Sequence, residues 1–301
     1  MIDTFDAVLP HGITLNCRAS GQPGAPLLVL LHGFPEAAFV WDDMLEHFGD
    51  RYRCIAPNLR GFGPSSAPAG VEHYRVKHLM ADIQALIAQQ GEGATVEALI
   101  AHDWGGALAW TLAALKPELM KRLVIINSPH PATFLRELRH SPQQQAASAY
   151  MNFLCRPDAE KLLAENDFER LWHLFENMGA ADASRKGGGW LTGPVRDQYR
   201  AVWRAGLTGG CNYYRASPLR PPTAADSSVM KISFTPEFVT VKLPTLVIWA
   251  EDDLALPKSL VDGLDAFVPD MRLVRVPGAT HWIIHERPKL IAAEIATHLA
   301  V

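Results

Sequence analysis

The sequence contains few of the features that mark several common classes of protein. Only four of its 301 residues are cysteine, and they lie far apart at Cys17, Cys54, Cys155 and Cys211. No pair has Cys-x-x-Cys spacing and no histidine stands at metal-site spacing from them, so neither a disulfide framework nor a zinc site is predicted. This cysteine usage favours a reducing compartment. We therefore expect a cytoplasmic protein that needs no metal ion and no cofactor.

The chain also lacks an excess of basic residues and a long apolar run. There are 28 Lys and Arg residues against 32 Asp and Glu, with a formal net charge of −4, so no basic surface for nucleic acid or anionic lipid is expected. The most apolar stretch, residues 95–115, is interrupted by Asp103 and does not suit a bilayer span of ~20 residues. The first ten residues contain two acids and no basic cluster, which is not the pattern of a secretory signal. We expect no nucleic-acid partner and no membrane partner.

Short apolar runs separated by helical patterns are present at both ends of the chain. Four of these runs have the length and composition of buried strands, at residues 27–31, 53–56, 96–101 and 123–126, and strand signals return at residues 245–249 and 271–276. Strands that alternate with helices are typical of a mostly parallel sheet flanked by helices. Residues 5–19 resemble two strands around a turn, and we expect them to form an antiparallel edge.

The middle of the chain has no long β-branched runs and contains helical patterns instead, such as residues 159–178. A last helix is expected from Pro288 to the end. These patterns predict an α/β core in two parts, residues 1–128 and 241–301. A helical cap of residues 129–240 is predicted to be inserted after the fourth buried strand.

The candidate chemistry follows the strands, because ligands of parallel α/β sheets bind beyond the carboxyl ends of the strands. After the run at 96–101, the sequence His-Asp-Trp-Gly-Gly places Asp103 between small residues two positions to either side. This is the form of the tight strand-to-helix turn that presents a nucleophile. Aspartate is also a common helix N-cap, and the turn alone does not decide between the two roles.

Two later residues favour the nucleophile. Asp253 follows the run at 245–249, and His281 follows the run at 271–276. The order nucleophile, acid, histidine is that of α/β-hydrolase triads. His285 is a weaker candidate for the histidine, since it falls where the next helix is expected to begin.

Other residues near these positions complete the predicted site. Glu251 and Asp252 rank below Asp253 as the acid because they lie nearer the strand. The loop after the first buried strand is expected to supply one oxyanion-hole donor, the backbone N–H of Phe34, and Trp104 the other. His102 is expected to help shape the turn.

Five segments in the same order resemble the α/β-hydrolase-fold epoxide hydrolases, most closely the soluble epoxide hydrolase branch. They are HGFP at 32–35, RGFGPSSAP at 60–68, HDWGG at 102–106, AEDD at 250–253 and GATHW at 278–282. The resemblance covers nearly the whole chain and implies the α/β-hydrolase fold with a helical cap. The segment HDWG alone is shared with haloalkane dehalogenases.

The resemblance implies a hydrolase that opens an epoxide with water to a vicinal diol. A carboxylate, with an ordinary pKa near 3.9, is ionised at neutral pH and can attack a saturated carbon without a base, which would leave an alkyl ester on Asp103. Water activated by His281 and Asp253 would then hydrolyse this ester. The epoxide oxygen needs a proton donor, and the two cap tyrosines of the family match Tyr150 and Tyr214.

Two other functions stay open. A haloalkane or haloacid dehalogenase would use the same aspartate, but many of the former have Asn where Phe34 stands, and fluoroacetate dehalogenases have Arg where Trp104 stands. A non-enzymatic ligand-binding relative has no need for the complete triad. The expected partners are a small apolar epoxide and water, and the oligomeric state is not predicted. We expect the substrate pocket to include His32, Pro35, Phe153 and Trp282.

Overall fold

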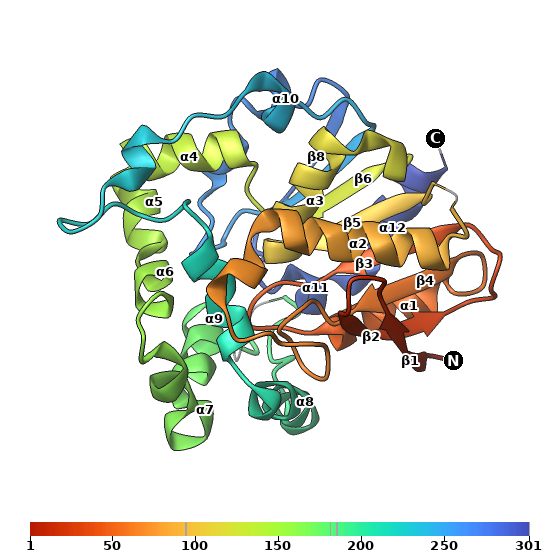
Figure 1. The fold of residues 1–301 in the computed structure, drawn as a ribbon, viewed down its shortest axis with the longest axis horizontal. Coiled ribbons are helices and arrows are strands. Elements are labelled where there is room, and N and C mark those ends of the chain that lie inside the picture. The colour runs from red at the N-terminus through yellow and green to blue at the C-terminus, as the bar shows by residue number, and fades with distance from the viewer. Residues whose placement is uncertain (94, 181, 185, 301) are drawn as a thin grey trace.

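An eight-stranded sheet runs through the computed structural model, which describes residues 1–93, 95–180, 182–184 and 186–300 (Figure 1). The strands lie in the order β1-β2-β4-β3-β5-β6-β7-β8. Their bounds are β1 Asp3–Val8, β2 Thr14–Ser20, β3 Leu27–Leu31, β4 Arg53–Pro57, β5 Ala98–His102, β6 Leu123–Ile126, β7 Thr245–Ala250 and β8 Met271–Val276.

Strands β3 to β8 pair in parallel, and β1 and β2 form the antiparallel edge. Strands β3, β5, β6 and β7 are buried along their whole length, as their continuous apolar runs require. The predicted α/β-hydrolase fold with a mostly parallel sheet is therefore confirmed. The fifth strand begins at Ala98 rather than at the predicted Val96, which makes only an isolated bridge with Met120.

Helices cover both faces of this sheet (Figure 1). Helices α2 and α3 contact each other on one face, and α1 and α12 contact each other on the other. The helices of the core are α1 Asp42–Phe48, α2 Val76–Gln90, α3 Asp103–Leu115, α11 Ile283–Glu286 and α12 Pro288–Leu299. Short 3₁₀ helices of the core are η1 Ala38–Trp41, η2 Val71–Tyr74, η3 Pro117–Leu119, η5 Lys258–Val261 and η6 Leu264–Ala266.

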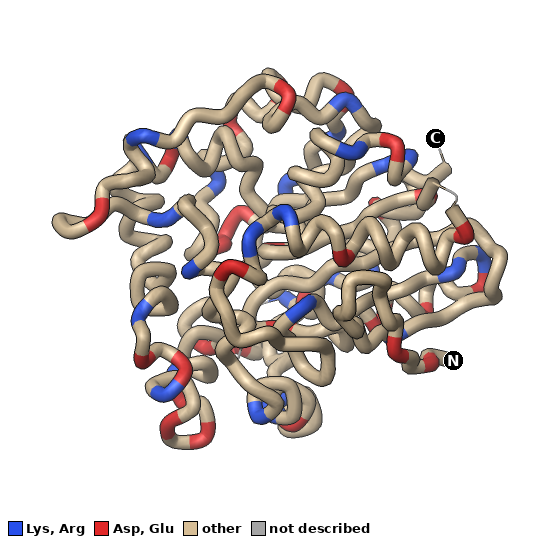
Figure 2. Tube along the Cα trace, in the orientation of Figure 1, with Lys and Arg blue, Asp and Glu red and all other residues tan. Residues whose placement is uncertain are grey.

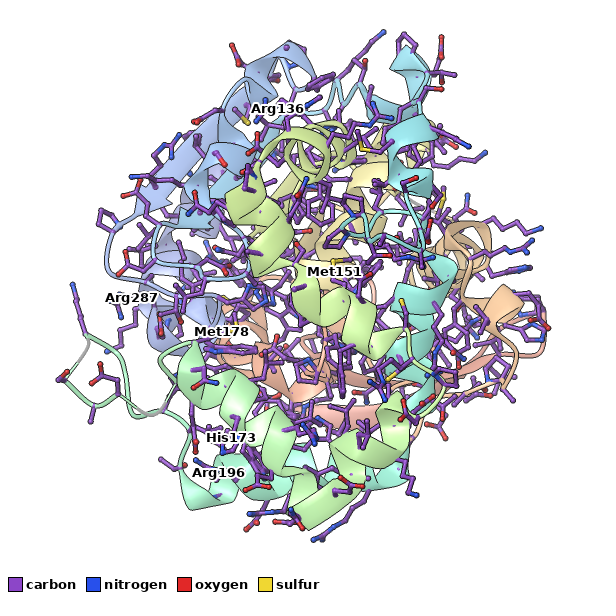
Figure 3. All side chains as sticks on the ribbon, turned by 90° about the vertical axis from the view of Figure 1, so that its left-hand side faces the viewer. Arg136, Met151, His173, Met178, Arg196 and Arg287 are labelled. Atoms are coloured by element: carbon purple, nitrogen blue, oxygen red, sulfur yellow. The ribbon has the colours of Figure 1, made fainter. Side chains whose placement is uncertain are left out.

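The chain between β6 and β7 is helical throughout its regular elements, as far as the structure describes it. We call this segment, residues 129–240, the helical insertion. Figure 3 views it from its outer side, with Met151 on α6 and His173 on α7. Its helices are α4 Pro131–His140, α5 Pro142–Ala147, α6 Ala149–Leu154, α7 Ala159–Asn177, α8 Gly193–Ala205, α9 Thr208–Ala216, η4 Ser228–Lys231 and α10 Pro236–Val239.

Helix α7 is interrupted, although the sequence pattern predicts a continuous helix over residues 159–178. Asn166 and Asp167 have left-handed backbone conformations, which these two residue types tolerate better than most. The interruption frees the carbonyl of Asp167 from the helix, and this carbonyl accepts a hydrogen bond of 2.8 Å from the indole of Trp172. The side chain of Asp167 also makes a tertiary contact that local periodicity does not encode, a 2.7 Å ion pair with Arg200 of α8.

The surface carries charges of both signs. Figure 2 shows acidic and basic positions interspersed along the chain, in keeping with the small net charge of −4. Within the described ranges, no helix has both the length and the apolar character needed to cross a membrane.

Candidate active site

Asp103 lies at a tight turn between β5 and α3. It is the first residue of α3 and has a left-handed backbone, with φ of 48°. Small neighbours are required here, because a Cβ on Gly105 would lie 2.5 Å from the carbonyl oxygen of Leu31. A Cβ on Gly33, in the loop after β3, would collide with the side chain of Asp103 itself.

The carboxylate of Asp103 faces the site rather than its own helix. Its Oδ1 accepts a hydrogen bond of 2.7 Å from the backbone N–H of Phe34, and its Oδ2 lies 3.8 Å from Nε2 of His281. The N-cap position of α3 is held by His102. The geometry therefore favours the turn that presents a nucleophile over the helix cap.

Asp253 and His281 lie beside this carboxylate. The Nδ1 atom of His281 is 2.7 Å from Oδ2 of Asp253. The backbone N–H groups of Ala255 and Leu256 donate to Oδ1, and the Asn127 amide donates to Oδ2 at 2.9 Å. Burial alone would raise the pKa of Asp253, but His281 and these donors lower it below its ordinary value. Asp253 is thus held as a carboxylate.

Glu251, one of the two competing acids, pairs with an arginine instead. Glu251 is 3.6 Å from Arg275 and does not contact His281, whereas Asp253 does so directly.

His281 is surrounded by negative charge. Its burial opposes protonation, but the carboxylates of Asp253, Asp103 and Glu36 outweigh burial and raise its pKa to about 9. In the free protein at neutral pH, the imidazole therefore carries a second proton.

The helical insertion contributes two tyrosines to this site, Tyr150 of α6 and Tyr214 of α9. Their rings meet edge to face with centroids 5.9 Å apart, and Tyr214 also contacts the rings of Phe34 and Trp104. Burial, reinforced by the charge of Asp103, raises the pKa of both hydroxyls above the ordinary value. Both tyrosines consequently stay protonated and can donate hydrogen bonds.

Trp104 follows Asp103 as the second residue of α3. The first backbone N–H groups of a helix have no acceptor within the helix, so the N–H of Trp104 is open to an external acceptor. Together with the N–H of Phe34, it is positioned at the predicted oxyanion hole.

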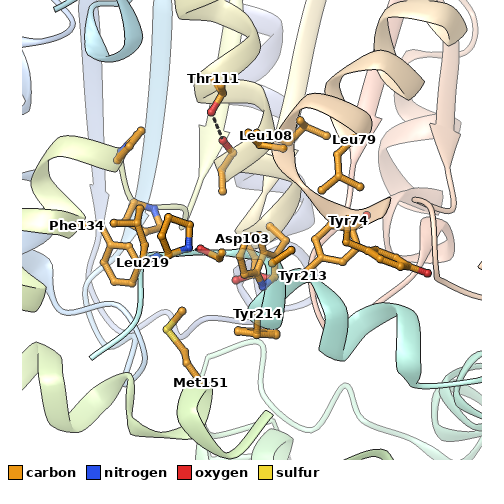
Figure 4. Close-up of a pocket in the computed structure, with 18 of the residues that line it drawn as sticks. Tyr74, Leu79, Asp103, Leu108, Thr111, Phe134, Met151, Tyr213, Tyr214 and Leu219 are labelled. Atoms are coloured by element: carbon orange, nitrogen blue, oxygen red, sulfur yellow. Dashed lines mark hydrogen bonds between the residues drawn. The ribbon is translucent and has the colours of Figure 1, made fainter. Parts of the chain in front are cut away.

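Two cavities of about 380 and 200 Å³ meet at Asp103, Tyr150 and Tyr214. Figure 4 shows residues that line the larger one. The walls of the larger cavity are mostly apolar and include Leu79, Leu108, Phe134, Met151, Leu219 and Phe238. The smaller cavity is bounded by Phe34, Leu174, Met178, Leu254, His281 and Trp282. An apolar molecule with its reacting atom at Asp103 has room on both sides.

The chain matches the alpha/beta hydrolase fold family over residues 26–288. The chain belongs to the α/β-hydrolase fold family.

Individual relatives narrow this assignment. The chain is 35% identical to the AB hydrolase superfamily protein YfhM of Bacillus subtilis (strain 168), over 96% of this chain and 95% of that protein. It is 33% identical to epoxide hydrolase 4 of Mus musculus, over 93% and 74% of the two chains. The crystal structure of an epoxide hydrolase from Bacillus megaterium, with an inhibitor, is similar with a TM-score of 0.88 at 28% identity, covering 99% and 100% of the two chains. The predicted resemblance to α/β-hydrolase-fold epoxide hydrolases is confirmed.

The pocket predicted from the sequence needs correction. Of its four residues, Trp282 borders the smaller cavity, but neither of the two described cavities is bounded by the other three. His32 is fully buried and accepts a hydrogen bond from the backbone of Leu59 through Nε2. Pro35 accepts a hydrogen bond through its carbonyl, and Phe153 lies beneath the guanidinium of Arg156. Proximity in sequence to a motif did not determine which side chains face the cavities.

Sequence reasoning missed a buried carboxylate, Glu36. Its Oε2 lies 3.1 Å from Nδ1 of His102, whose Nε2 lies 3.0 Å from the carbonyl oxygen of His281. His102 therefore connects the Glu36 carboxylate to the backbone of His281 through its two ring nitrogens. Burial would raise the pKa of Glu36, but hydrogen bonds from His102 and His285 lower it well below its usual range.

Asn127, which holds Asp253, was also missed. Its position at the end of β6 was the available signal, because this is the sheet edge where the other site residues gather. Glu36 had a similar signal, since it directly follows the HGFP segment.

Proposed function

We propose that this chain is an epoxide hydrolase that opens an epoxide to a vicinal diol through a covalent ester on Asp103. The supporting observation is the arrangement of the groups around Asp103. The Asp103 carboxylate lies against the N–H of Phe34 and 3.8 Å from His281, at the junction of two cavities that Tyr150 and Tyr214 also line.

In the first step, a carboxylate oxygen of Asp103 attacks one carbon of the epoxide ring and breaks its bond to the ring oxygen. The oxygen leaves as an alkoxide, and a tyrosine hydroxyl donates the proton that it needs. Tyr150 and Tyr214 suit this role because burial raises the pKa of both, which keeps the proton available until charge develops on the ring oxygen.

The proton balance follows from the charge around His281. In the free enzyme the imidazole holds two protons because Asp103 and Asp253 are negative. Ester formation removes the charge of Asp103, which weakens the hold of the imidazole on its second proton. That proton neutralises the tyrosinate left by the first step, and His281 becomes a neutral base.

In the second step, His281 takes a proton from water, and the resulting hydroxide adds to the carboxyl carbon of the ester. The N–H groups of Phe34 and Trp104 stabilise the oxyanion, a contribution of about 3–4 kcal/mol per well-placed donor. Collapse breaks the bond from the carboxyl carbon to the alkyl oxygen and leaves Asp103 as a carboxylic acid, and the product alkoxide takes up the proton of this acid. The carboxylate of Asp103 and the imidazolium of His281 are restored.

We further propose that residues 129–240 act as a cap domain over a core formed by residues 1–128 and 241–301. This cap contributes Tyr150, Tyr214 and most of the apolar wall of the larger cavity. The substrate that fits this lining is a small apolar epoxide.

A side-by-side assay with styrene oxide, 1-bromobutane and fluoroacetate tests the proposal. We expect diol from styrene oxide and no comparable halide release from the other two. The variant Asp103→Asn should form no diol, because an amide is a poor nucleophile. Faster halide release than diol formation would overturn the assignment, as would wild-type diol formation by Asp103→Asn.

A further inference from the structure

Helix α8 of the helical insertion contacts the core at two polar points that lie beside the site but outside the cavities. Tyr199 and Trp203 are both buried and stand four residues apart, so they project from the same face of α8. Each makes a hydrogen bond to the loop that follows β3.

The first contact is made by Trp203. Its indole N–H donates a 2.8 Å hydrogen bond to the carbonyl oxygen of Pro35. Pro35 directly follows Phe34, whose N–H reaches Asp103. The Pro35 carbonyl is two peptide units along the chain from the N–H of Phe34, so a shift of this carbonyl would be transmitted through the Phe34–Pro35 unit to the proposed oxyanion donor.

The second contact is made by Tyr199. Its hydroxyl donates to Oε1 of Glu36 at 3.1 Å and lies 2.9 Å from Nε2 of His285. The other oxygen of Glu36 contacts His102, and His102 contacts the carbonyl oxygen of His281. A chain of three contacts thus links α8 to the backbone of the histidine that is proposed to activate water.

We infer that Tyr199 and Trp203 are positioning residues for ester hydrolysis. Through them, α8 holds in place the backbone of His281 and the loop that follows β3, which carries the N–H of Phe34 and which we call the oxyanion loop. This inference rests on the proposed covalent mechanism. Attack by Asp103 depends on its charge and on donors from α6 and α9, none of which is carried by α8. Hydrolysis depends on the two groups that α8 holds in place.

The test compares Tyr199→Phe and Trp203→Phe with a matched control, Trp172→Phe. Trp172 is buried in the same aromatic cluster, with its ring centroid 4.4 Å from that of Trp203. Its indole also donates a 2.8 Å hydrogen bond to a carbonyl, that of Asp167, but both partners lie within the helical insertion. The control therefore removes a bond of the same type and a similar volume without touching the oxyanion loop.

The effect on kcat relative to kcat/KM and the steady-state fraction of ester distinguish a positioning role from a loss of folded protein. We expect kcat to fall about 10-fold in each α8 variant, as misplacement of reacting groups does. Because kcat/KM reports steps up to alkylation, a slower hydrolysis should lower kcat and KM together and leave kcat/KM little changed. Rapid quenching with intact-mass detection should show a larger steady-state fraction of ester than in the wild type, and Trp172→Phe should match the wild type.

A fall in kcat at unchanged KM and unchanged ester fraction would overturn the inference, since it indicates only fewer folded molecules. A joint fall of kcat and KM in the control Trp172→Phe would overturn the inference too. Absence of any ester in His281→Gln would instead contradict the covalent mechanism, so the two failures are distinguishable.

Discussion

At the scale of single residues, the site is defined by which charges face one another. Asp103, Asp253 and Glu36 place three carboxylates around His281 and raise its pKa to about 9, against the opposing effect of burial. The tyrosine hydroxyls are shifted in the direction that keeps them protonated. In the proposed mechanism, the same buried environment supplies the nucleophile, the proton donors and a base whose charge depends on the state of Asp103.

The dependence of His281 on Asp103 can be measured directly. In Asp103→Asn the charge that lies 3.8 Å from Nε2 is removed, so the imidazolium loses stabilisation and its pKa should fall below the value of about 9. NMR titration of the His281 ring against the wild type measures this change, and His11, which lies outside the site, serves as an internal reference. An equal or higher pKa in the variant would contradict the proposed switch of His281 to a base.

The tyrosines should share the leaving oxygen. Tyr150→Phe and Tyr214→Phe should each slow alkylation by about 10- to 100-fold, toward the lower end of general-acid effects, because one hydroxyl remains. The double variant should be far slower, since the alkoxide then lacks a proton donor. Single-turnover ester formation from an epoxide measures these rates. Epoxide opening at a near wild-type rate by the double variant would exclude the proposed role of the tyrosines.

At the scale of elements, the strands were the most predictable part of the fold. The predicted bounds of β3 and β6 agree with the structure because continuous apolar runs end where the chain leaves the sheet. The predicted bounds of β8 agree as well, although two arginines interrupt its apolar residues. The interruption of α7 was not predictable, since the apolar periodicity does not report left-handed backbone at Asn166 and Asp167, and the ion pair of Asp167 with Arg200 of α8 joins residues far apart in sequence.

The candidate site likewise contains residues that the sequence predicted and residues that it did not. Asp103, Asp253 and His281 were found because each follows a strand, and parallel strands bring those positions to one edge. Glu36 and Tyr199 lie 163 residues apart in sequence and meet only through packing of α8 on the core, which no local pattern reports. Phe153 stands three residues after Tyr150 on α6 but borders neither of the two described cavities, so its predicted place in the pocket stays a prediction.

A prediction at the scale of elements concerns the turn at Asp103. Gly33→Ala should lower turnover by about 100-fold, because its Cβ has to displace the nucleophile or the loop that follows β3. Gly193→Ala is the control, since a Cβ there meets nothing within 4 Å and its backbone is not left-handed. Diol formation and thermal unfolding of both variants check the effect. Full activity of Gly33→Ala would mean that the loop does not press on Asp103.

At the scale of the whole molecule, the site exists only where the helical insertion meets the core. The core carries Asp103, Asp253 and His281, and the insertion carries Tyr150 and Tyr214. Both cavities at Asp103 are bounded by residues from both parts of the chain. The proposed alkylation therefore draws on residues from both parts of the chain, whereas the proposed hydrolysis draws on His281 and Asp253 of the core.

The measurement that tests the account most directly is the intact mass of His281→Gln mixed with styrene oxide. Asp103 should still attack, but without its base the ester should persist, and the protein should gain the mass of one substrate molecule. Peptide mapping should place the added mass on Asp103, and Asp103→Asn should gain none. A folded His281→Gln that gains no mass, beside a wild type that forms diol, would contradict the covalent mechanism.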